Sequence, residues 1–188
     1  MDSEPEVTTD SREELVDIVD EHNEVVEVTT RARMRTEKLP HRASYIALCD
    51  RQGRYLVEIR TLCKDYAPGK FDACVGGIMQ HGEEEVESAR RELLEELGID
   101  AADAAAQVEF TPLGVQQVMY ADGVHFLMAY LYFARADCIT VRQKSEVSGL
   151  MYLTREELLA LSHDCTYDSV QVFREIISRA EDLGLNPP

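Results

Sequence analysis

The stretch that decides the fold is residues 76–99, which read GGIMQHGEEEVESARRELLEELGI. It opens with two adjacent glycines and contains seven glutamates, with two arginines set in its middle. Charge runs in an acidic chain are most often solvated surface. The spacing of these charges therefore has to distinguish a solvated face from a functional one.

Residues 84–97 are predicted to form a helix whose two neighbouring faces differ in character. One face is an apolar stripe that can pack on a sheet, formed by Val86, Ala89, Leu93 and Leu97. Glu92, Glu95 and Glu96 stand at i, i+3 and i+4 on the other face, where like charges repel one another. A divalent cation would remove that repulsion, and carboxylate oxygens suit Mg²⁺ or Mn²⁺.

The charge of the whole chain restricts its partners. The 188 residues include 36 acidic and 19 basic side chains, giving a formal net charge of −17. This balance argues against a nucleic-acid polymer held by general electrostatics. A small anionic substrate would need local cations at its binding site. No apolar run approaches the roughly 18 residues that span a membrane, so we expect no membrane partner.

Length and cysteine usage indicate a cytoplasmic protein with one domain. Residues 1–12 are expected to be a flexible acidic tail, and they lack the apolar segment of a secretory signal. Residues 13–188 are expected to form a single domain with a short N-terminal hairpin extension and a C-terminal helix. The five cysteines are scattered without a CxxC pair, which fits a reducing cytosol better than a disulfide framework.

The rest of the chain predicts a mixture of strands and helices. The expected elements are a hairpin of residues 15–19 and 24–28, a short helix within 29–38, a hairpin of 43–50 and 54–62 around DRQG, a strand near 71–75, strands at 108–120 and 125–134, and helices at 155–161 and about 167–183. Because strands and helices do not alternate as βαβ units, we expect an α+β fold with a mixed or antiparallel sheet.

The spacing within residues 77–99 resembles the Nudix hydrolase signature. Glu83 follows Gly77 after five residues, and Arg91 follows Glu83 after seven. The chain then reads RELLEELGI, which matches Arg-Glu, aliphatic, any, Glu-Glu, any, Gly, aliphatic at every position. The sequence is similar to Nudix hydrolases over their most specific motif, without a gap.

This resemblance implies an α/β/α sandwich with a mixed sheet, on which the motif forms a loop–helix–loop. It further implies Mg²⁺ or Mn²⁺ held against the diphosphate of a small substrate. The implied metal ligands are Glu92, Glu95, Glu96 and the carbonyl of Gly76, with Gly77 shaping the substrate loop and with Arg91 and Glu83 bracing the helix. Dimers are common in the family, so the resemblance also allows a homodimer.

The group that accepts the proton from water stays open between two glutamates. Members of the family differ in which carboxylate serves as the base. Glu92 lies in the helix, whereas Glu146 lies in KSEVSGLMYLTREEL, a segment resembling the later strand and loop where many members carry an extra glutamate.

A narrower resemblance precedes the motif. The segments LPHRASYIAL and RTLCKDYAPGKFD resemble a Nudix subgroup related to isopentenyl-diphosphate isomerase. In that isomerase an arginine and a lysine four residues later hold the diphosphate, and Arg60 and Lys64 match that spacing. They would supply the local cations that the net charge otherwise denies an anionic substrate. His41 falls at a metal-binding histidine of the isomerase, although a lone histidine before a strand is more often structural.

The chemistry of the isomerase does not carry over with this resemblance. Its catalytic cysteine falls at Gly76, and Cys74 is only a weak substitute two positions away. We therefore expect a metal-dependent hydrolase that cleaves the diphosphate linkage of a nucleoside-diphosphate-linked or related small molecule by water attack on phosphorus. The alternatives are a prenyl-diphosphate isomerase-like enzyme and a Nudix-fold binding module without turnover.

Overall fold

The computed structural model describes residues 11–64, 66–137, 147–185 and 187. Its elements, in chain order, are η1 (Ser11–Glu13), β1 (Leu15–Val19), β2 (Val25–Thr30), α1 (Arg31–Glu37), β3 (Arg42–Cys49), β4 (Tyr55–Arg60), β5 (Phe71–Asp72), α2 (Glu85–Leu97), η2 (Ala104–Ala106), β6 (Glu109–Met119), β7 (Phe126–Arg135), β8 (Val147–Leu153), α3 (Arg155–Ala160) and α4 (Tyr167–Asp182). None of the helices in the described part of the chain is long and apolar enough to cross a membrane.

The main sheet is mixed, as the sequence predicted. Five of its six strands follow the order β5-β4-β3-β7-β6, and β8 pairs with β4 outside this path. β3 runs parallel to β7, in a register that places Ile46 opposite Tyr132. The pairs β6–β7, β4–β8 and β4–β5 are antiparallel.

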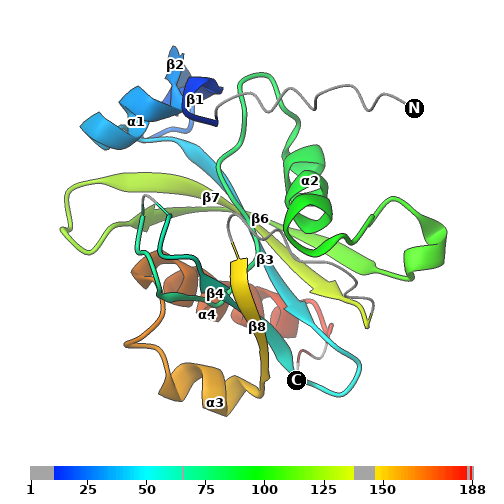
Figure 1. The fold of residues 1–188 in the computed structure, drawn as a ribbon. Coiled ribbons are helices and arrows are strands. Elements are labelled where there is room, and N and C mark those ends of the chain that lie inside the picture. The colour runs from blue at the N-terminus through cyan, green and yellow to red at the C-terminus, as the bar shows by residue number, and fades with distance from the viewer. Residues whose placement is uncertain (1–10, 65, 138–146, 186, 188) are drawn as a thin grey trace, which may run out of the picture.

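Helices cover both faces of this sheet (Figure 1). Along β7 successive side chains alternate between the faces, as they do in any strand. Leu131 and Phe133 pack in the core that contains the inner face of α4, whereas Tyr130 and Tyr132 pack in the core that contains the inner stripe of α2. The predicted α/β/α sandwich is confirmed.

The expected N-terminal hairpin is present as the antiparallel pair β1–β2, which is separate from the main sheet. The helix that follows begins where expected, because the Thr30 side chain accepts a hydrogen bond from the Arg33 amide. Val16, Ile18 and Met34 form a small core together with Ile78 from the loop before α2. The hairpin therefore supports that loop from the side.

The predicted hairpin of β3 and β4 is only partly correct. The turn at DRQG is closed by a 2.8 Å hydrogen bond from the Asp50 amide to the Arg54 carbonyl. Beyond the turn the two strands pair only at Cys49 and Tyr55. They then diverge, because β3 takes β7 as its partner and β4 takes β8. The edge of β3 that β4 leaves is paired instead by the loop before α2, where Ile46 and Val75 exchange backbone hydrogen bonds at 2.8 and 3.0 Å.

Candidate active site

Helix α2 is fixed by its buried stripe and by its C-terminal cap. Ala89, Leu93 and Leu97 are fully buried against the sheet. Gly98 ends the helix in the left-handed region at φ 67°, where its amide donates to the carbonyls of Leu93 and Leu94. Only glycine adopts this conformation at little energetic cost. The cap and the stripe together fix how the glutamates of α2 face the sheet.

The three glutamates of the signature are not equally placed. Glu92 and Glu96 are buried, with 7% and 3% of their surface exposed. Glu95 lies further out, with 47% of its side chain exposed. The sequence placed all three on one face, and the structure shows that two of them line its inner edge.

Arg91 joins the glutamates to the loop before the helix. Its guanidinium donates to both oxygens of Glu83, at 2.7 and 3.0 Å. The same group donates to Glu92 at 2.8 Å and to Glu95 at 3.2 Å. Burial alone would raise the pKa of Glu83, but the hydrogen bonds from Arg91 and from the Gln80 amide lower it below its ordinary value. The Arg91–Glu83 pairing that the resemblance implied is therefore present.

The two adjacent glycines let the loop pass between β3 and α2. A Cβ atom on Gly76 would lie 2.0 Å from the Ser44 carbonyl oxygen, and one on Gly77 would lie 2.5 Å from a carboxylate oxygen of Glu92. The Gly76 amide lies 3.3 Å from Oε2 of Glu96, to which it donates. Both glycines thus permit close approach of the backbone to the buried glutamates.

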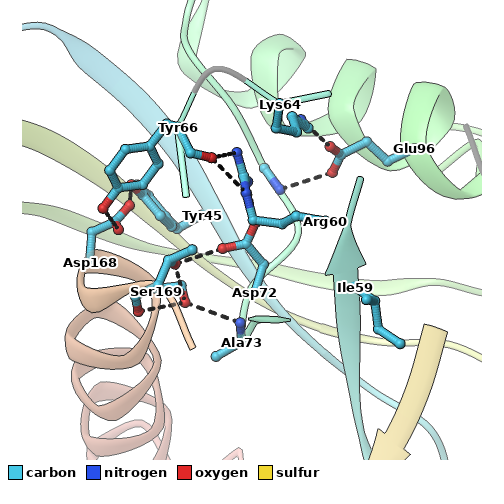
Figure 2. A network of polar contacts seen from close by, with 12 residues as sticks. Tyr45, Ile59, Arg60, Lys64, Tyr66, Asp72, Ala73, Glu96, Asp168 and Ser169 are labelled. Atoms are coloured by element: carbon cyan, nitrogen blue, oxygen red, sulfur yellow. Dashed lines mark hydrogen bonds and ion pairs between the residues drawn. The ribbon is translucent and has the colours of Figure 1, made fainter. Parts of the chain in front are cut away.

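The structure brings Lys64 to the glutamates, as Figure 2 shows, and directs Arg60 elsewhere. The Lys64 ammonium lies 4.0 Å from Oε1 of Glu96. Arg60 pairs with Asp72 and donates to the Tyr66 carbonyl at 2.7 and 3.1 Å. Of the two predicted diphosphate-binding cations, Lys64 faces the cluster directly, whereas Arg60 already holds partners of its own chain.

Glu58 is a further buried carboxylate that the sequence analysis missed. It lies on β4 with 3% of its surface exposed, and its carboxyl hydrogen bonds with that of Glu96. Burial, and then the charge of Asp72, raise the pKa of Glu58 to about 8. The sequence did carry a signal for Glu58. Alternate residues of a strand face the same side, so Leu56, Glu58 and Arg60 share one face of β4, and this face changes along the strand from apolar to charged.

The donor chemistry of the cluster fits a divalent cation of the Mg²⁺ or Mn²⁺ type. Glu58, Glu92, Glu95 and Glu96 supply only hard oxygen donors. Among the described residues, no three or more His, Cys, Asp or Glu side chains are already positioned to coordinate a metal ion. Arg91 and Lys64 instead lie against these carboxylates. A buried oxygen of Glu58 has no hydrogen-bond partner among the described residues, which is the kind of atom that a cation would satisfy.

Three other predicted positions do not join this cluster. Glu146, the second candidate base, lies outside the described residues. Cys74 packs in the core that contains α4, so it lies on the face of the sheet opposite the glutamates. Burial raises its pKa well above the ordinary value for a thiol. His41 is buried, with Nδ1 2.9 Å from the Leu39 carbonyl oxygen, as a structural histidine would be.

Comparison with known proteins places this site in a family. The NUDIX domain family matches residues 39–173. The protein YfcD of Shigella flexneri, named an uncharacterized Nudix hydrolase, is 41% identical over 158 residues, which cover 84% of this chain and 83% of that protein. A Yersinia pestis protein, likewise named an uncharacterized Nudix hydrolase, is 37% identical over 177 residues, covering 93% of each chain.

A solved structure agrees with this assignment. The crystal structure of DR0079 from Deinococcus radiodurans superposes with a TM-score of 0.73 at 27% identity, covering 87% of this chain and 99% of that one. The matched region contains the complete signature helix, its bracing arginine and the glycine loop. The chain belongs to the Nudix hydrolase family and is a Nudix-type pyrophosphatase.

Proposed function

We propose that this protein is a divalent-metal-dependent hydrolase of a small molecule in which a diphosphate links a nucleoside or a related group to a second group. The observation that carries the proposal is the arrangement around Glu96. That carboxylate is buried, as is Glu92, and it accepts a hydrogen bond from the Gly76 amide. The Lys64 ammonium lies 4.0 Å from it. Acidic ligands and a cation that suits phosphate oxygens thus meet in one place.

The residues of the cluster have separate roles in this proposal. Glu92, Glu95, Glu96 and the Gly76 carbonyl would hold Mg²⁺ or Mn²⁺. A cation bound there supplies positive charge for the diphosphate oxygens and lowers the pKa of water. Arg91 and Glu83 keep the carboxylates in place. Lys64 binds a phosphate oxygen, Gly77 keeps the loop close to Glu92, and Arg60 steadies the segment that carries Lys64.

Water attacks one phosphorus, the bond from that phosphorus to the bridging oxygen breaks, and this oxygen leaves with the other phosphate, while a carboxylate accepts the proton of the water. Glu92 is the candidate on α2, and Glu146 is the candidate in the segment before β8. Glu146→Gln separates them, because Glu92 is also a proposed metal ligand and its replacement would lower metal affinity in either case. A large loss of kcat in E146Q with metal affinity intact favours Glu146 as the base, whereas an unchanged kcat in E146Q favours Glu92.

The test of the proposal is turnover by the Glu96→Gln variant. The wild-type protein is incubated with Mg²⁺ or Mn²⁺ and NADH, ADP-ribose, dinucleoside polyphosphates, CoA, nucleoside triphosphates and isopentenyl diphosphate, and phosphate products are measured. E96Q is expected to lose several orders of magnitude in kcat, because a charged ligand is removed without a change of shape. Glu87→Gln is the matched control, since Glu87 lies on the exposed side of α2 and pairs only with Arg90 among the described residues.

Three outcomes would contradict the proposal. A near-wild-type rate for E96Q would remove the metal assignment. Tight binding of one compound without turnover of any would favour a binding module. Isomerisation of isopentenyl diphosphate would favour the second enzyme class, although Cys74, the weak substitute for the isomerase cysteine, lies on the other face of the sheet.

We also propose that the protein acts in the cytoplasm. Among the described residues four cysteines are present, Cys49, Cys63, Cys74 and Cys165, and all are free thiols. Free thiols are typical of a reducing compartment. The homodimer that the family resemblance allows stays a prediction.

A further inference from the structure

Glu58 is a buried carboxylate with an unsatisfied oxygen. Only 3% of its surface is exposed, and its Oε1 atom has no hydrogen-bond partner in the described part of the protein. A buried polar atom without a partner is unfavourable, and a buried carboxylate without a cation is more so. Such a group in a native fold needs an explanation.

The strand directs Glu58 toward the glutamates of α2. Side chains alternate along β4, so Glu58 shares a face with Leu56. Leu56 packs in the core formed with the inner stripe of α2, whereas Tyr55 and Val57 pack on the side of α4. The Glu58 carboxyl hydrogen bonds with Glu96 and feels the charge of Glu92. Its position beside both buried glutamates therefore follows from the register of the strand.

The local cations are already engaged with other acids. Asp72 stands opposite Glu58 on β5 and would repel it. Asp72, however, is paired with Arg60 and accepts a 2.7 Å hydrogen bond from the Thr166 hydroxyl. Arg91 donates to Glu83, Glu92 and Glu95. Lys64 attracts Glu58 but lies against Glu96, and the described residues form no ion pair to Glu58 itself.

We infer that Glu58 is a further ligand for the divalent cation held by Glu92 and Glu96, contributed by the sheet instead of the signature helix. This inference rests on the proposed function, because it adds an oxygen to the same ion. Three buried carboxylates from two elements make a site of hard donors that suits Mg²⁺ or Mn²⁺. A ligand on β4 would also tie the end of α2 to the sheet when the ion is bound.

The experiment measures metal binding in the absence of substrate. Free Mn²⁺ is followed by electron paramagnetic resonance during titration of wild type, Glu58→Gln, Glu96→Gln and the exposed control Glu87→Gln. E58Q is expected to bind Mn²⁺ about 10- to 100-fold more weakly than wild type, and E87Q is expected to bind like wild type. Metal-free E58Q is expected to melt at or above the wild-type temperature, because glutamine keeps the shape and removes a buried acid.

The outcomes separate the inference from the proposed function. If wild type fails to bind Mn²⁺, or E96Q binds like wild type, the proposed metal site itself is wrong. If wild type binds and E96Q does not, while E58Q binds like wild type, only the role of Glu58 is overturned. A loss of kcat in E58Q with unchanged Mn²⁺ affinity also overturns it, since Glu58 would then act without contacting the ion.

A second variant keeps the test decisive if E58Q does not fold. Glu58→Asp retains the carboxylate but withdraws it by one methylene group. As a ligand at a fixed strand position, the shortened side chain is expected to weaken Mn²⁺ binding by about tenfold. Unchanged affinity in E58D would overturn the inference.

Discussion

His41 is buried beside Ile18 of β1, and its Nδ1 atom lies 2.9 Å from the Leu39 carbonyl oxygen. Burial, and then the charge of Arg35, lower its pKa from 6.5 to about 4; Arg31 acts in the same direction, while Asp168 and the Leu39 hydrogen bond oppose the shift. In the unfolded chain His41 therefore binds a proton near pH 6.5, whereas in the folded protein it binds one only near pH 4. The contribution of neutral His41 to the free energy of unfolding is fully present above pH 6.5. It is lost as the pH falls from 6.5 toward 4, by about 3 kcal/mol in all.

The measurement is the free energy of unfolding in denaturant from pH 7 to pH 4.5 for wild type and His41→Gln. The difference between them is expected to change across this window, because glutamine cannot take up the proton. His163→Gln is the matched control, because it removes a histidine that is exposed at the surface. Parallel curves for wild type and H41Q would show that His41 does not control the acid response.

The segment between β4 and β5 carries Lys64 and is anchored to α4 through Tyr66. The hydroxyls of Tyr66 and Tyr45 donate to the two oxygens of Asp168, at 2.8 and 2.6 Å, as Figure 2 shows. Asp168 lies in the first turn of α4, where a negative charge is favoured. One aspartate thus positions the segment that carries Lys64 against helix α4.

Asp168→Asn is expected to lower the free energy of unfolding by about 2 kcal/mol, because two hydrogen bonds to a charged acceptor are weakened. It is also expected to raise KM for the substrate more than it lowers kcat, since it loosens the segment that carries Lys64 and leaves the glutamates of α2 in place. Denaturant unfolding and steady-state kinetics measure the two effects.

Tyr66→Phe and the surface variant Asp164→Asn complete that comparison. Y66F should reproduce the rise in KM, because it breaks the same anchor from the other side. D164N should change neither quantity, since Asp164 pairs only with exposed His163 among the described side chains. A drop in kcat alone for D168N would place Asp168 in the chemistry and not in the anchor.

What the sequence predicted well was local. The helix α2, its glycine cap and the Arg91–Glu83 pair all depend on residues within one short segment, where spacing determines geometry. Strand partners depend on distant segments, and the turn at DRQG gave no sign that β4 would leave β3 for β8. Pairing across the sheet is decided by the whole core, which local periodicity does not encode.

The same reason limits what the sequence shows of the site. The spacing of Arg60 and Lys64 predicted a pair of local cations for the substrate, and it gave no sign that Asp72 on the neighbouring strand engages Arg60. The sequence shows Glu58 as a charged residue on the inward-facing side of β4. Its place in the cluster depends on Glu92 and Glu96, which come from helix α2. Sites assembled across elements are therefore only partly visible in a single sequence.

Two kinds of charge repulsion act in the folded protein: one from the net charge of the whole chain, and one from the cluster of buried glutamates. The net charge of −17 makes the folded protein repel itself. Dissolved salt screens such repulsion over a length of about 10 Å at 0.1 M. The cluster of buried glutamates adds a local repulsion, and in the proposed function a divalent cation relieves it by binding. The two kinds of repulsion respond differently to NaCl and to MgCl₂.

Raising NaCl from about 50 mM to about 0.5 M is expected to raise Tm, because screening weakens self-repulsion more in the compact state. At equal ionic strength MgCl₂ is expected to raise Tm further, since a ligand at a hundred times its Kd stabilises the folded state by about 2.7 kcal/mol. A Glu92→Gln, Glu96→Gln double variant should keep the response to NaCl and lose the extra response to MgCl₂. Coincident NaCl and MgCl₂ curves for wild type would argue against a specific site, and a Tm that falls with NaCl would show that ion pairs outweigh the net charge.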